Sequence, residues 1–353
     1  MIKSYIFGTN LNFMKTTPFC LSIILLLTLS PVMAQYTETI NNNRPGASQG
    51  AFSVGTNVLQ LEGGFALGSE EHRLKETETS AFGFDYAIRY GFWREELEVS
   101  IIGEFESQSV TDNRGANSYT YKQSNFRSNT IGAKYLFYDP YRKMELKGPN
   151  LYSWKANYKF QWADLVPAIS FYAGANFDFA DNPFTLEPDS SISPKFVLST
   201  QNNWVGGFVF VTNIVVDRIT TDTPSYGYIL TLTHTLTDWF SVFIENQGFK
   251  SDFYADQLFR GGAAALVNKN FHVDASILLN FKDTPSRLYG RVGVAYRFDM
   301  HDTDEYIEEK GKEGRKLKKD KQTEKDLDTK KDKKKKRKDG FEDDGGGKSV
   351  TKL

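Results

Sequence analysis

Residues 289–298 read Tyr289-Gly290-Arg291-Val292-Gly293-Val294-Ala295-Tyr296-Arg297-Phe298, and the side chains alternate in character along this stretch. Every second residue from Val292 onward is apolar or aromatic, while the residues between them are glycine, alanine and arginine. A period of two is typical of a β-strand whose two faces meet different surroundings. The stretch therefore predicts a strand with an aliphatic and aromatic face and an opposite face that is polar and sparsely filled.

Upstream of this stretch, about eleven further segments read as strands bounded by turn-forming residues. The clearest is 80–91, where large apolar side chains at positions 82, 84, 86, 88 and 90 oppose glycine, alanine and charged residues. Such a strand is hard to place in a soluble core, but it suits a barrel whose outer face meets lipid and whose inner face is polar. The predicted strands cover residues 57–67, 80–91, 96–106, 129–138, 164–174, 194–202, 204–217, 225–235, 239–248, 258–267, 271–281 and 289–298.

The predicted fold class is therefore all-β, an antiparallel transmembrane barrel of about 12 strands over residues 57–298. Connection lengths support this interpretation, because short turns near 93–94, 202–203, 236–238 and 268–270 alternate with longer connections after the first, third and fifth strands. Bacterial barrels have short periplasmic turns and long extracellular loops. The connection over 139–163 is too long for this pattern, and either a small periplasmic element or an extra strand pair would account for it.

Bulk composition agrees with alternating strands. The chain has 353 residues, of which 40% are hydrophobic and 14% aromatic, and its mean hydropathy is only −0.46. In a barrel the apolar and polar faces average out, so low hydropathy does not argue against a membrane protein. No later segment is long and apolar enough for a transmembrane helix.

The N-terminus, residues 1–34, has the pattern of a signal peptide. Lys15 precedes an apolar run over 19–29, and Val32 and Ala34 fit a cleavage site before Gln35. Met14 is an alternative start, and Cys20 lies too early in the run for a lipoprotein. Cleavage would remove the one cysteine. The mature chain would then open with a polar lead over 35–56, which we expect in the periplasm.

Residues 299–353 differ from the rest in composition. Lysine, aspartate and glutamate dominate, as in the basic run 330–338, and such a segment cannot bury enough apolar surface to fold. We expect a disordered tail in the periplasm. It would bind peptidoglycan or an acidic periplasmic protein, or it would have no fixed partner; export excludes nucleic acid.

Several motifs resemble those of one family. They are Asn43-Arg44-Pro45-Gly46, the strand over 58–65, Ile131-Gly132-Ala133-Lys134-Tyr135, residues 236–246, Val273-Asp274-Ala275-Ser276 and Tyr296-Arg297-Phe298. In this order they resemble the outer-membrane barrel family labelled "putative MetA pathway of phenol degradation", over about residues 43–298. The resemblance implies a transporter-like barrel that passes aromatic or other small hydrophobic compounds. A terminal aromatic after the last strand also resembles the signal read by the barrel-assembly machinery, here Tyr296 and Phe298.

Charged residues fall on the inner face of the predicted strands and form the candidate site. In the last strands they alternate in sign, and more lie on the early strands that close against them; the set is Glu245, Arg260, Asp274, Arg291, Glu62, Asp85, Arg89, Glu98, Glu104 and Lys134. One interpretation is a charged constriction that selects solutes. The other is structural, because a barrel of about twelve strands has a narrow interior that paired charges would fill.

Catalysis has little support in the sequence. There are four histidines, and no motif places a serine and an orienting acid beside one of them, so His234 reads as an interface residue. No pattern indicates a metal site, a phosphate loop or another cofactor. Aromatic residues at strand ends fit interfacial girdles, with a stacking platform for aromatic solutes as the alternative.

Together these patterns predict an exported, non-enzymatic barrel in the outer membrane that gives passive or facilitated passage to a small, hydrophobic or aromatic solute. Its partners would be membrane lipid, the barrel-assembly machinery and that solute. The alternative is a closed structural or anchoring barrel, with a barrel enzyme as a minor third reading.

Overall fold

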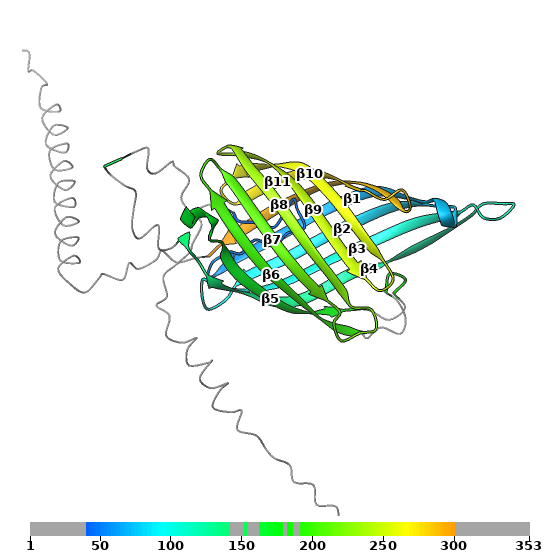
Figure 1. Cartoon of the computed structure of the whole chain (residues 1–353), viewed down its shortest axis with the longest axis horizontal. Coiled ribbons are helices and arrows are strands. Elements are labelled where there is room, and N and C mark those ends of the chain that lie inside the picture. Colours follow the sequence, from blue (N-terminus) through cyan, green and yellow to red (C-terminus); the bar gives the residue numbers. More distant parts are fainter. Residues whose placement is uncertain (1–39, 142–151, 154–161, 179–181, 186–190, 301–353) are drawn as a thin grey trace, which may run out of the picture. The chain divides into compact units, whose positions relative to one another are not determined.

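The computed structural model describes residues 40–141, 152–153, 162–178, 182–185 and 191–300. These residues form a closed antiparallel barrel of twelve strands in which β12 returns to pair with β1 (Figure 1). Every predicted strand position holds a strand, so the all-β barrel is confirmed. The strands are β1 (Val58–His72), β2 (Thr77–Gly91), β3 (Leu97–Asp112), β4 (Tyr119–Tyr138), β5 (Ala168–Phe177), β6 (Ile192–Trp204), β7 (Phe208–Asp217), β8 (Ser225–Thr237), β9 (Phe240–Ser251), β10 (Ala255–Asn268), β11 (Phe271–Asn280) and β12 (Ser286–Asp299).

The barrel closes along β1 and β12. Val58 lies opposite Asp299 and Glu71 lies opposite Ser286, with continuous pairing between these two points. Residues 289–298 form most of β12. They pair with β1 on one side and, as far as Tyr296, with β11 on the other. Closure leaves no strand edge along this seam, where an unpaired backbone in lipid would have no hydrogen-bond partner.

The two faces of the wall have opposite character, as the alternation predicts. On β1 the outward Phe65 and Leu67 are 53% and 66% exposed, whereas the inward Gln60 and Glu62 are buried. Arg89, Lys134 and Glu245 are among the largest fully buried side chains. The outer surface is therefore apolar and the interior is polar, the reverse of a soluble protein.

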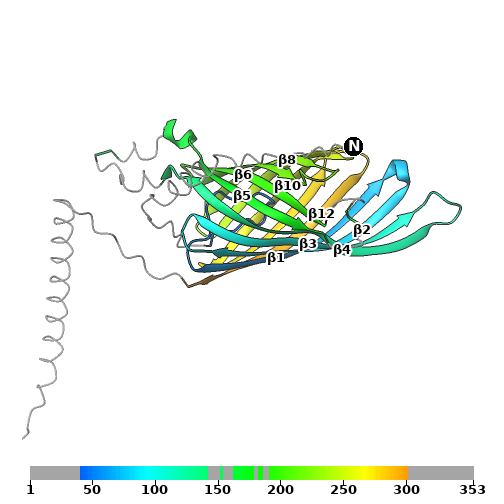
Figure 2. The same ribbon diagram turned by 90° about the horizontal axis from the view of Figure 1, so that it is seen from below.

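Two hairpins extend well past the rest of the wall. β1 and β2 continue to a short 3-10 turn, η1 (Arg73–Lys75), and β3 and β4 continue to the connection over 113–118. Figure 2 shows both hairpins projecting beyond the other strands at one end of the barrel. We call this the distal end, and the end where β1 begins the proximal end. The expectation of long loops after the first and third strands is thus wrong, because most of the residues in those connections prolong the strands.

The proximal connections are short at 205–207, 238–239 and 269–270. Pro167 lies within the predicted fifth strand, 164–174, and in the structure β5 begins directly after it, preceded by the 3-10 turn η2 (Trp162–Leu165). Proline therefore occupies a position where no ladder hydrogen bond is required.

Three expectations lie wholly or largely outside the described residues: the signal peptide, the tail beyond Met300, and the element expected within 139–163. In the part of the chain that is described, no helix is long and apolar enough to cross a membrane.

Candidate functional site in the barrel lumen

Residues 40–57 lie inside the barrel, and we call them the inner segment. At the proximal rim the backbone N–H of Ile40 donates to the Lys269 carbonyl (2.9 Å), and further along the backbone N–H of Val54 donates to Glu98 Oε2 (3.1 Å). Between Ile40 and Val54 the chain runs from the proximal rim into the lumen, turns, and comes back toward the start of β1. This position differs from the expected periplasmic lead. A polar segment can be satisfied either by water or by polar side chains of the lumen, so its composition alone does not distinguish the two locations.

The backbone of the inner segment is hydrogen-bonded to side chains around the lumen wall. Its N–H groups donate to carboxylates and amides: Asn43 to Glu62 (3.4 Å), Ala47 and Ser48 to Glu245 (2.9 and 3.3 Å), Gln49 to Asn213 (2.7 Å) and Ala51 to Gln201 (3.0 Å). Its carbonyls accept from donors: Asn41 from Arg89 (2.9 Å), Gln49 from Asn213 (2.8 Å), and Gly50 and Phe52 from Lys134 (3.1 and 2.8 Å). Irregular backbone at membrane depth requires such partners.

Arg44 bridges two aspartates of the wall, Asp274 on β11 and Asp85 on β2. Its Nε and Nη2 donate to Asp274 Oδ2 and Oδ1 (3.0 and 3.1 Å), and its Nη1 donates to Asp85. The Arg44 side chain is 9% exposed and that of Asp274 is fully buried. A forked guanidinium bound by two carboxylates is among the stronger charge-assisted contacts in proteins, and it is costly to break when buried.

A gap in the wall receives this guanidinium. Gly64 lies opposite Gly293, Gly64 also lies opposite Asp85, and Gly293 lies opposite Asp274. One row across four strands thus reads Asp274, Gly293, Gly64, Asp85. A Cβ on Gly64 would stand 2.3 Å from Arg44 Nη2, and one on Gly293 would stand 2.0 Å from it. Only glycine at both positions lets the guanidinium lie flat between the two carboxylates.

Glu245 binds the turn of the inner segment. Besides the N–H groups of Ala47 and Ser48, it accepts from Thr231 Oγ1 (2.8 Å) and from Arg260 Nη1. Glu245 and Arg260 are 2% and 4% exposed. The carboxylate therefore has both a counter-charge and several hydrogen-bond donors, as a buried charge requires.

Near the proximal end, a second buried cluster surrounds Arg89. Its Nε and Nη2 donate to Glu98 (2.8 Å each), and its Nη1 donates to Glu62 (3.0 Å). Lys134 Nζ lies 3.4 Å from Glu98. Apolar contact also holds the segment here, because Ala51 packs against Leu136 and Ala168.

Space remains in the lumen on the distal side of the inner segment. A cavity of about 390 Å³ has part of the segment, Arg44 and Pro45 among it, in its lining and extends to Asp217 and Ser225 near the distal ends of β7 and β8. A second cavity of about 230 Å³ shares Glu104 and Arg291 with the first. In this region Arg291 Nη2 donates to Glu104 (2.9 Å) and Arg127 Nη1 donates to Glu106.

The structure places the predicted charges as follows. Glu62, Arg89, Glu98 and Lys134 form the proximal cluster, Glu245 pairs with Arg260, and Arg291 pairs with Glu104. Asp274, from the last strands where charges were expected to alternate in sign, and Asp85, from the early strands, both bind Arg44. The pairing expected along the last strands is thus incomplete, because the missing cation comes from the inner segment.

Sequence reasoning missed Arg44 as a lumen residue, although it lies within Asn43-Arg44-Pro45-Gly46. Two aspartates with no basic neighbour in register on the inner face were the signal that could have revealed it. Asn213 and Gln201 were also missed, and uncharged amides on a strand carry no comparable signal.

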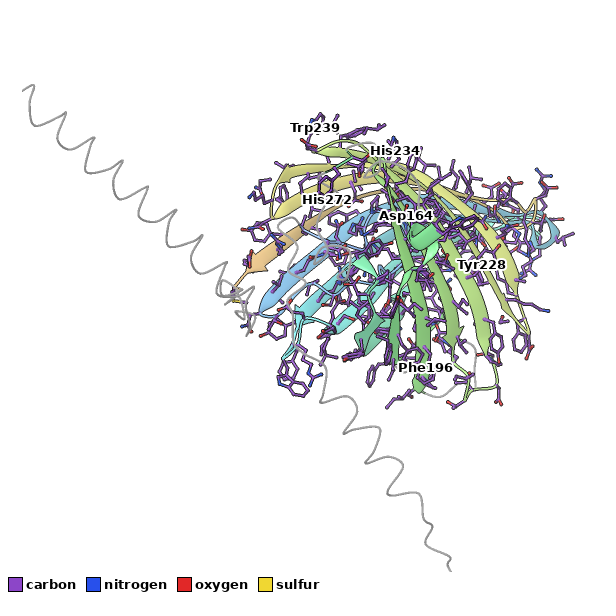
Figure 3. All side chains as sticks on the ribbon, turned by 60° about the vertical axis from the view of Figure 1, so that its left-hand side comes forward. Asp164, Phe196, Tyr228, His234, Trp239 and His272 are labelled. Atoms are coloured by element: carbon purple, nitrogen blue, oxygen red, sulfur yellow. The ribbon has the colours of Figure 1, made fainter. Side chains whose placement is uncertain are left out.

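The remaining predicted residues lie elsewhere. Tyr296 and Phe298 are exposed on the outer face, their rings 4.7 Å apart. His234 stacks on Phe208 (4.0 Å between ring centres) and lies at the rim near Trp239, whereas His272 lies within the barrel (Figure 3). There the His272 ring is 2.8 Å from Asn42 Nδ2. Among the described residues no group of three or more His, Cys, Asp or Glu could hold a metal ion.

A family profile described as "Putative MetA-pathway of phenol degradation" matches residues 42–298. The chain belongs to this family. The match begins within the inner segment and ends at Phe298, so it covers both the segment and the barrel. No curated protein matches the chain.

Several solved structures are similar in fold. They include an outer-membrane channel from Pseudomonas putida F1 (9% identity, 73% of this chain and 100% of that one, TM-score 0.47) and the NanC porin (10%, 67% and 98%, 0.41). The translocator domain of the autotransporter NalP from Neisseria meningitidis is a third (12%, 68% and 88%, 0.39). The closed antiparallel barrel with its apolar outer face agrees with the predicted fold class.

Proposed function

We propose that the protein is a channel of the outer membrane for a small solute, and that its inner segment closes the periplasmic half of the lumen. The observation that carries this proposal is the distribution of space. Polar contacts join the inner segment to the wall from the proximal rim up to Arg44 and Glu245, whereas the cavities extend from the segment toward the distal end. Passage then requires the segment to leave its position.

The lining of the larger cavity favours a solute with both polar and apolar parts. Charged side chains come from β1, β2, β3 and β12 and also from β6 and β7, where Lys195 and Asp217 lie. The apolar side chains come chiefly from β6 to β9; they are Val197, Val215, Ile229 and Phe249. At about 390 Å³ the cavity is at the small end of the range for ligand sites. A compact molecule with an apolar body suits it better than a sugar chain.

The alternative is a barrel that never opens and serves as a structural or anchoring protein. The same filled lumen favours it, because the segment is held by charge pairs as well as by backbone hydrogen bonds. We propose no enzymatic role, and we propose that residues 299–353 extend into the periplasm.

A reversible lock tests the proposal. Ala51 and Ala168 are both fully buried and belong to one apolar cluster. Cysteines are introduced at these two positions and oxidised, and mass spectrometry verifies the disulfide that ties the segment to β5 before conductance is recorded. Conductance in planar bilayers should be low when the pair is oxidised and should rise when a reductant is added. The single variants should not respond to reductant. Absence of conductance in the reduced double variant and the wild type would favour the closed structural barrel.

A further inference from the structure

The smaller lumen cavity is rich in arginine. Arg127, Arg260, Arg287 and Arg291 line it, against two carboxylates, Glu104 and Glu106. The other carboxylates that pair with these arginines, Glu245 for Arg260 and Glu70 and Asp256 for Arg287, are not part of the lining, and with them each of the four arginines has a counter-charge. A solute in this cavity meets more donors than acceptors.

Two of these donors lack partners. Arg260 Nε and Arg291 Nε are both buried, and neither has a hydrogen-bond partner among the described residues. Arg260 as a whole is 4% exposed. A buried N–H of a charged group without a partner is costly, so such donors mark a place where an acceptor normally sits. Their neighbours across the cavity include the apolar side chains of Leu258, Leu278 and Phe249.

We propose that Arg260 and Arg291 bind the carboxylate of a small organic acid, whose apolar body contacts Leu258, Leu278 and Phe249. A carboxylate has two oxygens and accepts one N–H from each arginine, which satisfies both free donors with charge-assisted hydrogen bonds. Water would satisfy the donors but would leave the apolar wall without a partner. The proposal names the solute class of the channel proposed above and rests on that function for its biological meaning.

Binding is measured without transport, using the full mature chain in detergent and titration calorimetry. Hexanoate is the probe, and hexanamide, which has the same shape and no charge, is its control. Hexanoate should bind saturably, and hexanamide should not bind over the same concentration range. If neither binds, or if both bind equally, the proposal is overturned.

Arg291→Gln should weaken hexanoate binding roughly tenfold, since it removes one charged donor. The matched control is Arg287→Gln, which lines the same cavity but has its Nε bound to Glu70 at 2.8 Å; its affinity should stay within about threefold of wild type. Equal losses of hexanoate affinity in both variants would indicate a nonspecific electrostatic effect of the arginines and would overturn the proposed binding site.

Arg260 also holds Glu245, so its removal endangers the fold, and Arg260→Lys is the second variant. Lysine keeps the charge but lacks the Nε donor, and it should also weaken binding. Unchanged affinity in both Arg291→Gln and Arg260→Lys overturns the proposal. A channel that conducts yet binds no hexanoate refutes this inference alone, whereas a barrel that never conducts refutes the proposed function and leaves the binding result standing.

Discussion

Gly64 of β1 lies directly opposite Gly293 of β12, and the guanidinium of Arg44 rests on both. The seam that closes the barrel is thus also the place where the inner segment is fixed. Asp274 and Asp85 flank the two glycines in the same row. The two glycines leave space at the wall, and a carboxylate lies on each side of that space. The row therefore accommodates one cationic side chain, and the inner segment supplies it as Arg44.

Replacing Gly293 by alanine should open the channel. The new Cβ would stand 2.0 Å from Arg44 Nη2, the end of a flexible side chain, so Arg44 must move while the strand keeps its register. Single-channel recordings should show a higher open probability than wild type. Gly290→Ala is the control on the same strand, because its Cβ would meet only the Leu67 carbonyl at 4.0 Å. Wild-type conductance in Gly293→Ala would contradict a role for this contact in closure.

Arg44→Gln should open the channel and also change its ion selectivity. The substitution leaves Asp85 and Asp274 without their cation, which for a buried pair costs about 3–5 kcal/mol. The open lumen should then favour cations more strongly than the lumen of Gly293→Ala, which keeps the arginine. Reversal potentials in a salt gradient measure this difference. Arg114→Gln is a control, since Arg114 is exposed and pairs with Asp112 at the distal tip. Identical selectivity in Arg44→Gln and Gly293→Ala would show that Arg44 does not set the field of the open lumen.

Arg89→Met should destabilise the barrel itself. Arg89 is 1% exposed, and its loss would leave the carboxylates of Glu62 and Glu98 buried with Lys134 as their remaining counter-charge. Removing one member of such a cluster typically costs about 3–5 kcal/mol. Urea unfolding in lipid vesicles should show a midpoint well below that of wild type.

The matched control for this stability change is Arg73→Met. Arg73 pairs with Glu71 at 3.7 Å, and both side chains are more than half exposed. An exposed pair of this kind contributes little, so the unfolding free energy should stay within about 0.5 kcal/mol of wild type. Equal effects of the two substitutions would mean that the Arg89 cluster is not a buried network in the folded protein.

The fold was predictable because each strand carries its own signal. In residues 289–298 the alternation of side chains reports which face meets lipid, and this needs no knowledge of distant contacts. The lengths of β1 to β4 were less predictable, since outside the membrane both faces meet water and the alternation fades, as in residues 119–128. Apart from the two aspartates that lack a basic neighbour in register, little in the sequence pointed to the inner segment. Its contacts join residues far apart in sequence, such as Arg44 and Asp274, and its backbone donors have no sequence signature.

The last prediction concerns which end of the barrel faces the cell exterior. We expect the distal end to be extracellular, because the proximal turns at 205–207, 238–239 and 269–270 are short, as periplasmic turns are. A protease site inserted after Gly115, in the connection between β3 and β4, should be cut in intact cells. A site inserted after Gly148, in the connection between β4 and β5, should be cut only after the outer membrane is permeabilised. Cleavage at Gly148 and protection at Gly115 in intact cells would reverse the orientation, and it would put the inner segment at the extracellular mouth of the channel.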